Sequence, residues 1–172
     1  ANIIPDECIY CGLCFVACPQ NAKQVRCDLP AAKALLASGE PVYVSLAPSF
    51  IADFEVAGIE ALAPALRELG FAGVEETAVG AQIVKTEYEK MIREKKQDVI
   101  ISSCCHSVNL LIQKYYPKAL GALAHTLSPM LAHAKDLKAR YPGAKVVFVG
   151  PCVSKKDEWD MYGGVDCVLT FE

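Results

Sequence analysis

The sequence lacks the long apolar runs, the excess of charge and the repeats that mark several large classes of protein. No run approaches the roughly 20 apolar residues that a membrane-spanning helix needs, and no signal-peptide pattern opens the chain. The formal net charge is only −3 and the basic residues are dispersed, which excludes a general attraction to nucleic acid or anionic lipid. We therefore expect a cytoplasmic globular protein that binds neither a membrane nor a nucleic acid.

Cysteine, by contrast, is abundant. There are nine cysteines among 172 residues, and in an acidic chain without a signal peptide they are expected to bind metal rather than to form a disulfide framework. Four fall between residues 8 and 18, two are adjacent at 104 and 105, and the others stand at 27, 152 and 167. We expect Cys167 to be a small buried side chain, and Cys27 has no assignment.

The first group of cysteines has the spacing of an iron–sulfur motif. The stretch ECIYCGLCFVACPQNA contains C-x2-C-x2-C-x3-C-P, the pattern of half a bacterial two-cluster ferredoxin. Its candidate metal ligands are Cys8, Cys11, Cys14 and Cys18. The alternative, a four-cysteine zinc site, usually needs two separated C-x2-C knuckles. The spacing therefore predicts a ferredoxin-like [4Fe–4S] segment over residues 1–30.

The complete ligand set of this cluster stays open. In two-cluster ferredoxins the fourth cysteine of such a run binds the other cluster. Either Cys18 completes a single cluster here, or a second half of the module lies upstream. Because the chain starts without methionine and ends in what reads as a strand-to-helix transition, we expect a fragment of a longer protein.

Beyond residue 30, strand patterns alternate with helical ones. We predict strands over 42–47, 73–77, 99–103, 145–150 and 165–169, and helices over 28–39, 51–69 with a break near Gly58, 81–96, 107–116 and 128–141. Such alternation predicts βαβ units. The expected fold of residues 31–172 is therefore α/β, a mainly parallel sheet with helices on both faces.

Two of the predicted strands lead into cysteines. The run VIIS precedes Cys104 and Cys105, and the run VVFVG precedes Cys152. Since parallel strands place their carboxyl ends on one edge of a sheet, Cys105 and Cys152 are expected to converge on one site. The following Lys155 and Lys156 suit an anionic thiolate–metal assembly, and the alternative is a solvated turn.

The histidines and aromatic residues have simpler interpretations. We interpret His106 as a helix-start residue and His125 and His133 as surface histidines. Tyr115, Tyr116 and Trp159 are interpreted as core or rim aromatics without a function.

Six motifs follow one another along the chain: SLAPSF, LRELGFAGVEETAVGAQ, ISSCCHS, SPM, GPCVSKKDE and VDCVLTFE. In this order they resemble the amino-terminal lobe of the [FeFe]-hydrogenase catalytic domain, preceded by a ferredoxin-type segment. The resemblance covers nearly the whole chain, and its most specific part is SCC together with PC-x-x-KK-x-E.

The resemblance implies an activity and a ligand set. In that family a [4Fe–4S] cubane is bridged to a two-iron unit with CO, cyanide and a dithiolate, together called the H-cluster, which interconverts protons and hydrogen. Cys105 and Cys152 match the first two of its four cysteine ligands, and the other two would lie beyond Glu172. Cys104 matches the thiol that passes protons to the two-iron unit, and Lys155 matches a lysine that contacts cyanide. The resemblance thus implies an H-cluster only in the full-length protein.

Departures from the catalytic pattern favour a sensory member. Catalytic members usually read CCPGW, whereas this chain reads CCHSV, with His106 and Val108 in place of proline and tryptophan. Their proton path uses two glutamates and a serine, and ungapped alignment places Tyr88, Met91 and Ala124 there. Methionine and alanine cannot relay protons, and tyrosine is a poor relay at neutral pH. We therefore expect an inactive fragment of a hydrogen- or redox-sensing protein.

Two alternatives remain, and each implies different partners. A hydrogenase enzyme needs a redox partner such as ferredoxin or flavodoxin, whereas a sensor needs an output domain beyond the fragment. A non-catalytic iron–sulfur assembly protein on the same scaffold is the other alternative. Gly150, where catalytic members often carry a methionine beside the cluster, is a further departure.

Overall fold

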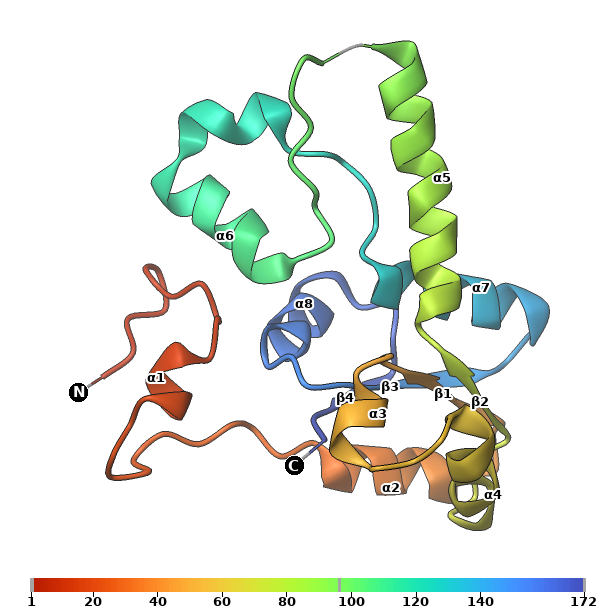
Figure 1. Cartoon of the computed structure of the whole chain (residues 1–172). Helices are drawn as coiled ribbons and strands as arrows, with labels where there is room; N and C mark the ends of the chain where they lie inside the picture. The colour runs from red at the N-terminus through yellow and green to blue at the C-terminus, as the bar shows by residue number, and fades with distance from the viewer. Residues whose placement is uncertain (1, 96, 172) are drawn as a thin grey trace.

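A four-stranded parallel sheet lies at the centre of the fold in the computed structural model, which describes residues 2–95 and 97–171 (Figure 1). The strands are β1 (Val42–Leu46), β2 (Gly73–Glu76), β3 (Lys145–Val149) and β4 (Cys167–Leu169). They stand in the order β2-β1-β3-β4, and every neighbouring pair is parallel. The two central strands, β1 and β3, are rich in valine, which packs well on a pleated surface.

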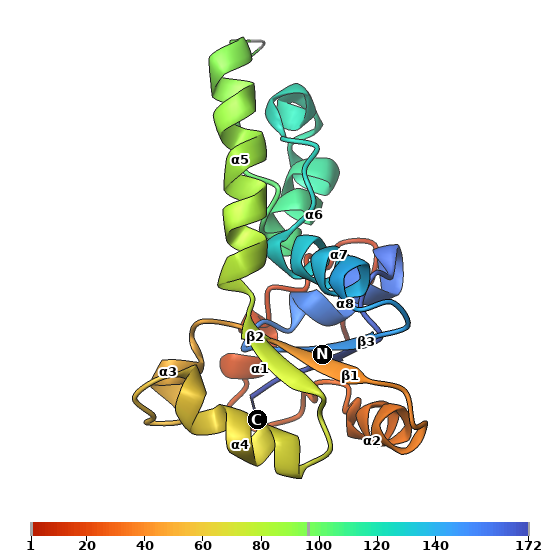
Figure 2. The same ribbon diagram turned by 90° about the vertical axis from the view of Figure 1, so that its right-hand side faces the viewer.

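Helices cover both faces of this sheet (Figure 2). One face carries α2 (Leu29–Ala37), α3 (Phe50–Asp53) and α4 (Ile59–Glu68), and the other carries α7 (Pro129–Arg140) and α8 (Ser154–Tyr162), with α5 (Ala78–Glu94) packed against α7. Since successive side chains of a strand point to opposite faces, Val44 and Val147 are buried in one core and Val146 and Phe148 in the other. The predicted α/β class is confirmed.

Local sequence signals explain where the helices begin. Pro30 stands in the first turn of α2, where its missing N–H costs no hydrogen bond. The Ser128 side chain accepts the N–H of Leu131 at 3.4 Å and so caps α7. Gly58 separates α3 from α4, as predicted. The predicted helices are present with ends shifted by a few residues, and residue 96 of the third lies outside the described residues.

The strand predicted over residues 99–103 is wrong. This segment does not join the sheet, and in the described chain it makes a single parallel bridge, between Ile101 and Leu123. The Ile101 N–H donates to the carbonyl of Ala122 at 2.8 Å, and the Ala124 N–H donates to that of Ile101 at 2.9 Å. Because α5 carries the chain well away from the sheet (Figure 1), the run pairs with another connecting segment, and Val99 stays 63% exposed.

Three helical segments were not predicted: the single-turn α1 (Leu13–Val16) near the amino terminus, the short 3₁₀ helix η1 (Pro117–Ala122), and α8. The sequence of α8 hides its helical period, because its buried side chains are the polar Ser154, Lys156 and Glu158. The Lys156 Nζ lies 2.6 Å from Asp28 Oδ2 and donates to the carbonyl of Val168 at 2.9 Å. The interpretation of the lysine pair as a solvated turn is therefore wrong.

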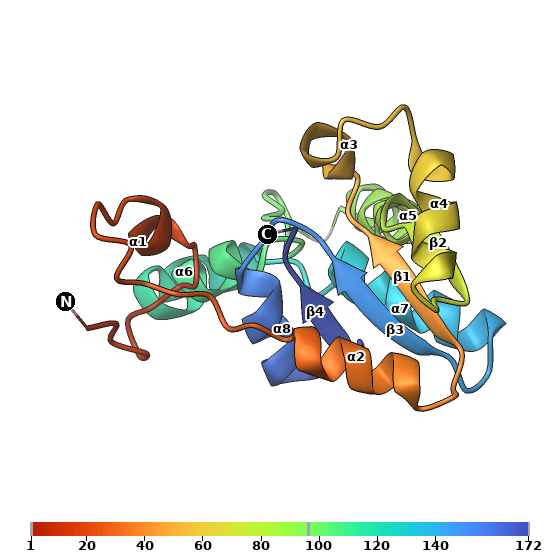
Figure 3. The same cartoon turned by 90° about the horizontal axis from the view of Figure 1, so that it is seen from below.

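The amino-terminal segment, residues 2–28, lies outside the sheet domain and beside α6 (His106–Tyr115) and α8 (Figure 3). Its one short helix, α1 (Leu13–Val16), has no buried residue. Among the helices of the described chain, none combines the length and the apolar character needed to cross a membrane. The fold thus places the cysteine-rich segment against α6 and α8, which are the helices that follow Cys105 and Cys152.

Candidate metal centre

Three of the four amino-terminal cysteines line one cavity. Cys8, Cys11 and Cys14 border a space of about 890 Å³ between the amino-terminal segment, the end of α6 and the outer side of α8. Cys18, which follows α1, is not among the described residues that border it. The structure therefore brings three predicted ligands to a common space.

Backbone N–H groups point at sulfur in this segment. The Tyr10 N–H donates to Cys8 Sγ at 3.3 Å, and the Ala22 N–H donates to Cys18 Sγ at 3.3 Å. Hydrogen bonds from the backbone of Ala22 and of Gln20 lower the pKa of the Cys18 thiol. Such donors favour the thiolate, which is the form that binds iron.

The donor set fits a [4Fe–4S] cluster, because Cys8, Cys11 and Cys14 border one large space. Thiolates around a cubane bind separate iron atoms and lie further apart than those around one zinc ion. Three thiols around one large space, with N–H groups aimed at sulfur, suit a [4Fe–4S] cluster.

The second group of predicted ligands lies where α6 and α8 begin. Cys105 is the residue before α6, and Cys152 stands two residues before α8 with its Sγ 3.0 Å from the hydroxyl of Ser154. Both thiols are exposed. Cys152 follows β3 as predicted, but Cys105 follows a connecting segment rather than a strand of the sheet. The expectation that two strand ends place these cysteines together is therefore wrong for Cys105.

Two side-chain contacts join these loops instead. The Lys155 ammonium donates to the backbone carbonyl of Cys104 at 3.3 Å and also pairs with Glu158. The His106 Nε2 lies 2.6 Å from Asp157 Oδ2. Each contact links the start of α6 to the first turn of α8. Polar side chains of α8, rather than the ends of two strands, therefore connect the Cys105 loop with the Cys152 loop.

His106 is the first residue of α6, as predicted, and is only 1% exposed. Its Nδ1 has no hydrogen-bond partner among the described residues. Its ring meets the ring of Tyr162 edge-on, with centroids 6.0 Å apart. Buried between α6 and α8, His106 fixes the position of the cysteine that precedes it.

Hydroxyl groups surround Cys104. The Tyr88 hydroxyl, from α5, lies 3.8 Å from Cys104 Sγ, accepts the N–H of Ser103 at 2.9 Å and accepts from the Thr126 hydroxyl at 3.0 Å. Met91 and Ala124 occupy the other two positions that align with the family's proton path, and neither side chain carries a hydroxyl or a carboxylate. The sequence interpretation missed Ser103 and Thr126, although serine beside the cysteine pair was a visible signal.

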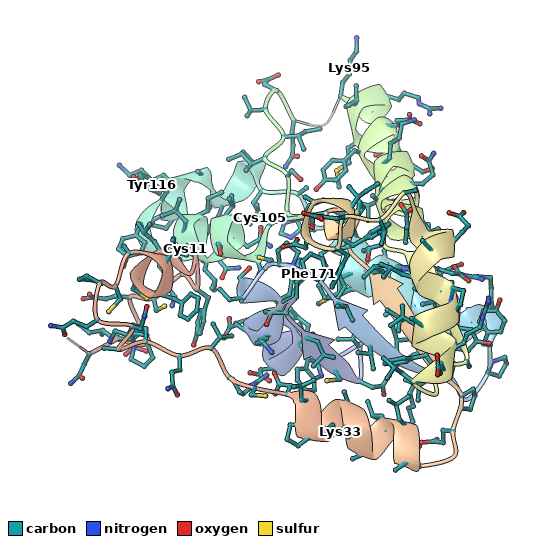
Figure 4. All side chains as sticks on the ribbon, turned by 60° about the horizontal axis from the view of Figure 1, so that its bottom comes forward. Cys11, Lys33, Lys95, Cys105, Tyr116 and Phe171 are labelled. Carbon is teal, nitrogen blue, oxygen red and sulfur yellow. The ribbon has the colours of Figure 1, made fainter. Side chains whose placement is uncertain are left out.

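The amino-terminal cysteines and Cys152 are close neighbours in the fold. Gly12 has a φ of +79°, and a Cβ built on it would lie 3.0 Å from Val153 Cγ2, next to Cys152. Burial and the nearby Asp157 carboxylate raise the pKa of the Tyr10 hydroxyl, which hydrogen-bonds that carboxylate. The loop between Cys8 and Cys14 thus packs directly against the start of α8, and Figure 4 shows Cys11 on one side of α6 and Cys105 at its start.

One predicted surface histidine is instead buried. His133, on the face of α7 that packs against the sheet, is fully buried, with Nδ1 2.8 Å from the Ser45 hydroxyl and Nε2 3.3 Å from Glu75 Oε2. Burial lowers the pKa of His133. Arg140 pairs with the same Glu75. Hydrogen bonds connect Ser45 to His133 and His133 to Glu75, as in the serine, histidine and acid of a hydrolytic triad. Ser45 is fully buried, however, so the network serves packing.

Comparison with known families gives two matches. Residues 40–172 match the family described as iron only hydrogenase large subunit, C-terminal domain. Residues 1–24 match the 4Fe-4S binding domain. The second match supports a [4Fe–4S] cluster in the segment that holds Cys8, Cys11, Cys14 and Cys18, and together the two support an iron–sulfur electron-transfer role.

Proposed function

The chain belongs to the iron-only hydrogenase large-subunit family, and from this premise we propose that it carries the electron-transfer segment and amino-terminal lobe of a hydrogen- or redox-sensing protein. The observation that carries the proposal is the packing of the cluster loop against the start of α8, where Gly12 meets Val153. Electron transfer between two metal centres needs such proximity, and this contact puts the cluster loop next to the loop that carries Cys152.

The amino-terminal thiols hold the first centre in this proposal. Cys8, Cys11 and Cys14 would bind a [4Fe–4S] cluster, with the fourth ligand supplied from outside the run or by Cys18. A cluster bound there supplies one-electron transfer. The protein contributes N–H groups aimed at sulfur and a cavity whose wall includes α8. A redox partner such as a ferredoxin or flavodoxin, or an output domain, would exchange electrons with this segment.

The thiols at the starts of α6 and α8 belong to the second centre. Cys105 and Cys152 would supply two of the four ligands of an H-cluster, in a protein that also carries the other two. Both thiols are exposed and are therefore open to a bound group. Gly150, which precedes the Cys152 loop, has no room for a side chain, because a Cβ there would lie 2.8 Å from Ala47 Cβ. Lys155 positions a cation between the two cysteine loops.

The surroundings of Cys104 favour sensing over rapid turnover. Its thiol faces the hydroxyl of Tyr88, whereas the family's catalytic members place a carboxylic acid at the aligned position. Hydroxyl groups without a carboxylate exchange protons slowly at neutral pH. Cys104 therefore keeps a proton-handling position, with a path that supports slow exchange.

The experiment is a hydrogen-evolution assay of the complete protein, matured anaerobically and supplied with a low-potential electron donor. We expect turnover far below that of a fast hydrogenase, together with infrared bands of CO and cyanide bound to iron. Turnover comparable to that of a fast hydrogenase would reject the sensory role. A protein that takes up only cubane iron and shows no such bands would indicate the assembly role.

A further inference from the structure

The last turn of α6 holds the loop that carries the first candidate ligand. The Lys114 ammonium donates to the backbone carbonyl of Cys8 at 2.7 Å and to that of Pro5 at 3.0 Å. The Tyr115 hydroxyl donates to the carbonyl of Glu7 at 2.6 Å. Helix α6 therefore begins directly after Cys105, and a side chain of its last turn binds the backbone carbonyl of Cys8.

We propose that Lys114 raises the reduction potential of the iron–sulfur cluster bound by the Cys8 loop, by placing a positive charge beside one of its ligands. The proposal rests on the cluster assigned above and concerns the thermodynamics of that cluster. It makes Lys114 a positioning and tuning residue rather than a catalytic one.

The charge of Lys114 is what distinguishes it from its neighbours. No carboxylate of the described chain forms an ion pair with Lys114, and its hydrogen bonds go to neutral carbonyl groups. By contrast, Lys155 pairs with Glu158, and Lys156 pairs with Asp28. A neutral donor would satisfy the same carbonyls, as Tyr115 does for Glu7. Lys114 therefore makes no ion-pair contact with a carboxylate of the described residues, and Asp6 and Glu7 are the acidic residues of the loop that it binds.

A nearby cation favours the reduced cluster for a simple electrostatic reason. One electron, taken from a donor such as dithionite, makes a thiolate-bound cluster more negative by one charge, with no bond formed or broken. A positive charge a few ångströms away stabilises that state, and net charge near the sulfurs is a known determinant of cluster potential. A higher potential makes this cluster a better acceptor of electrons from the Cys105–Cys152 side, as a hydrogen sensor requires.

The test is a potentiometric EPR titration of the cluster-loaded protein and its variants at low and high ionic strength. Lys114→Gln keeps a hydrogen-bond donor and removes the charge, so its midpoint potential should be more negative than that of the wild type. Because Lys114 is exposed, added salt should shrink this difference. Lys114→Arg should stay near the wild type.

Two matched controls separate charge from structure. Tyr115→Phe removes a hydrogen bond to the same loop without changing charge, and Lys90→Gln removes a charge from exposed α5. Both should leave the midpoint potential unchanged. Lys114→Met provides a second neutral variant if Lys114→Gln does not assemble a cluster.

The outcomes distinguish the tuning role from the function on which it rests. A Lys114→Gln protein with an intact cluster and the wild-type potential overturns the tuning role and leaves electron transfer standing. Cluster loss in both neutral variants, with retention in Lys114→Arg, also overturns it, because Lys114 would then serve assembly. A wild-type protein without any iron–sulfur cluster rejects the proposed function itself.

Discussion

Residues 2–28 differ from residues 29–95 and 97–171 in what their side chains pack against. In the amino-terminal segment Leu13 is 67% exposed and Val16 is 79% exposed, and α1 has no buried residue. In the following lobe, Val44 and Val147 are fully buried between two layers of helices. The lobe therefore has a hydrophobic core that stabilises its fold, whereas we expect the segment to depend on metal ligation and on its contacts with α6 and α8.

The largest expected effect on stability comes from shortening a buried leucine of the lobe, compared with shortening an exposed leucine of the amino-terminal segment. Leu137, on α7, is fully buried, so Leu137→Ala should lower the free energy of unfolding by roughly 2–5 kcal/mol. Leu13→Ala in the segment should change it by less than about 0.5 kcal/mol. Urea unfolding followed by circular dichroism measures both. Similar losses in the two variants would contradict the contrast between the regions.

A buried ion pair joins the two regions and gives the next largest effect. Lys156 and Asp28 are 6% and 9% exposed, and their charged atoms lie 2.6 Å apart. Lys156→Met should destabilise the protein by about 1–3 kcal/mol, because the buried Asp28 carboxylate and the Val168 carbonyl lose this donor, while Arg26 keeps its ion pair with Asp28. The Lys33→Met variant, at an exposed position on α2, is the control. An unchanged urea midpoint for Lys156→Met would show that the pair does not hold the junction.

A smaller effect is the response of the lobe to acid. Burial lowers the pKa of His133 below its ordinary value of 6.5, so the unfolded state takes up this proton first as the pH falls. Stability should therefore decrease as the pH falls below about 6.5, down to the lowered pKa of the folded state. Glu75, whose pKa is lowered chiefly by its hydrogen bond with Arg140, adds a separate loss below about 4.5.

The pH dependence is measured as the urea midpoint between pH 7 and pH 5. His133→Gln should flatten this dependence, although the variant is less stable overall because it disturbs the contact with Ser45. His125→Gln, at an exposed histidine, should keep the wild-type slope. A His133→Gln protein with the wild-type slope would assign the pH response to another group.

Local patterns were sufficient to predict most of the architecture. Apolar alternation and helical period located the four strands of the sheet and the helices α2, α4, α5, α6 and α7, and the C-x2-C-x2-C-x3-C-P spacing located the segment that matches a 4Fe-4S domain. These features depend on residues close together in the chain. Pattern analysis is most reliable for such features.

The remaining features depend on contacts distant in sequence. An apolar run such as residues 99–103 reads alike whether it enters a sheet or pairs with a connecting segment. The period of α8 is hidden because Lys156 is buried through an ion pair made with a residue 128 positions away. His133 is buried by partners on β1 and β2 that its own helix does not reveal. The link between Gly12 and Val153 has no local signature.

The central claim, that the amino-terminal segment binds an iron–sulfur cluster, is tested most directly by metal analysis of the anaerobically reconstituted chain. Iron, zinc and acid-labile sulfide are counted, and an EPR spectrum is recorded after reduction with dithionite. The account predicts equal amounts of iron and sulfide in [4Fe–4S] proportion, a reduced-cluster signal, and loss of both in Cys14→Ser. Stoichiometric zinc without sulfide, or the same iron content in Cys14→Ser, would contradict it.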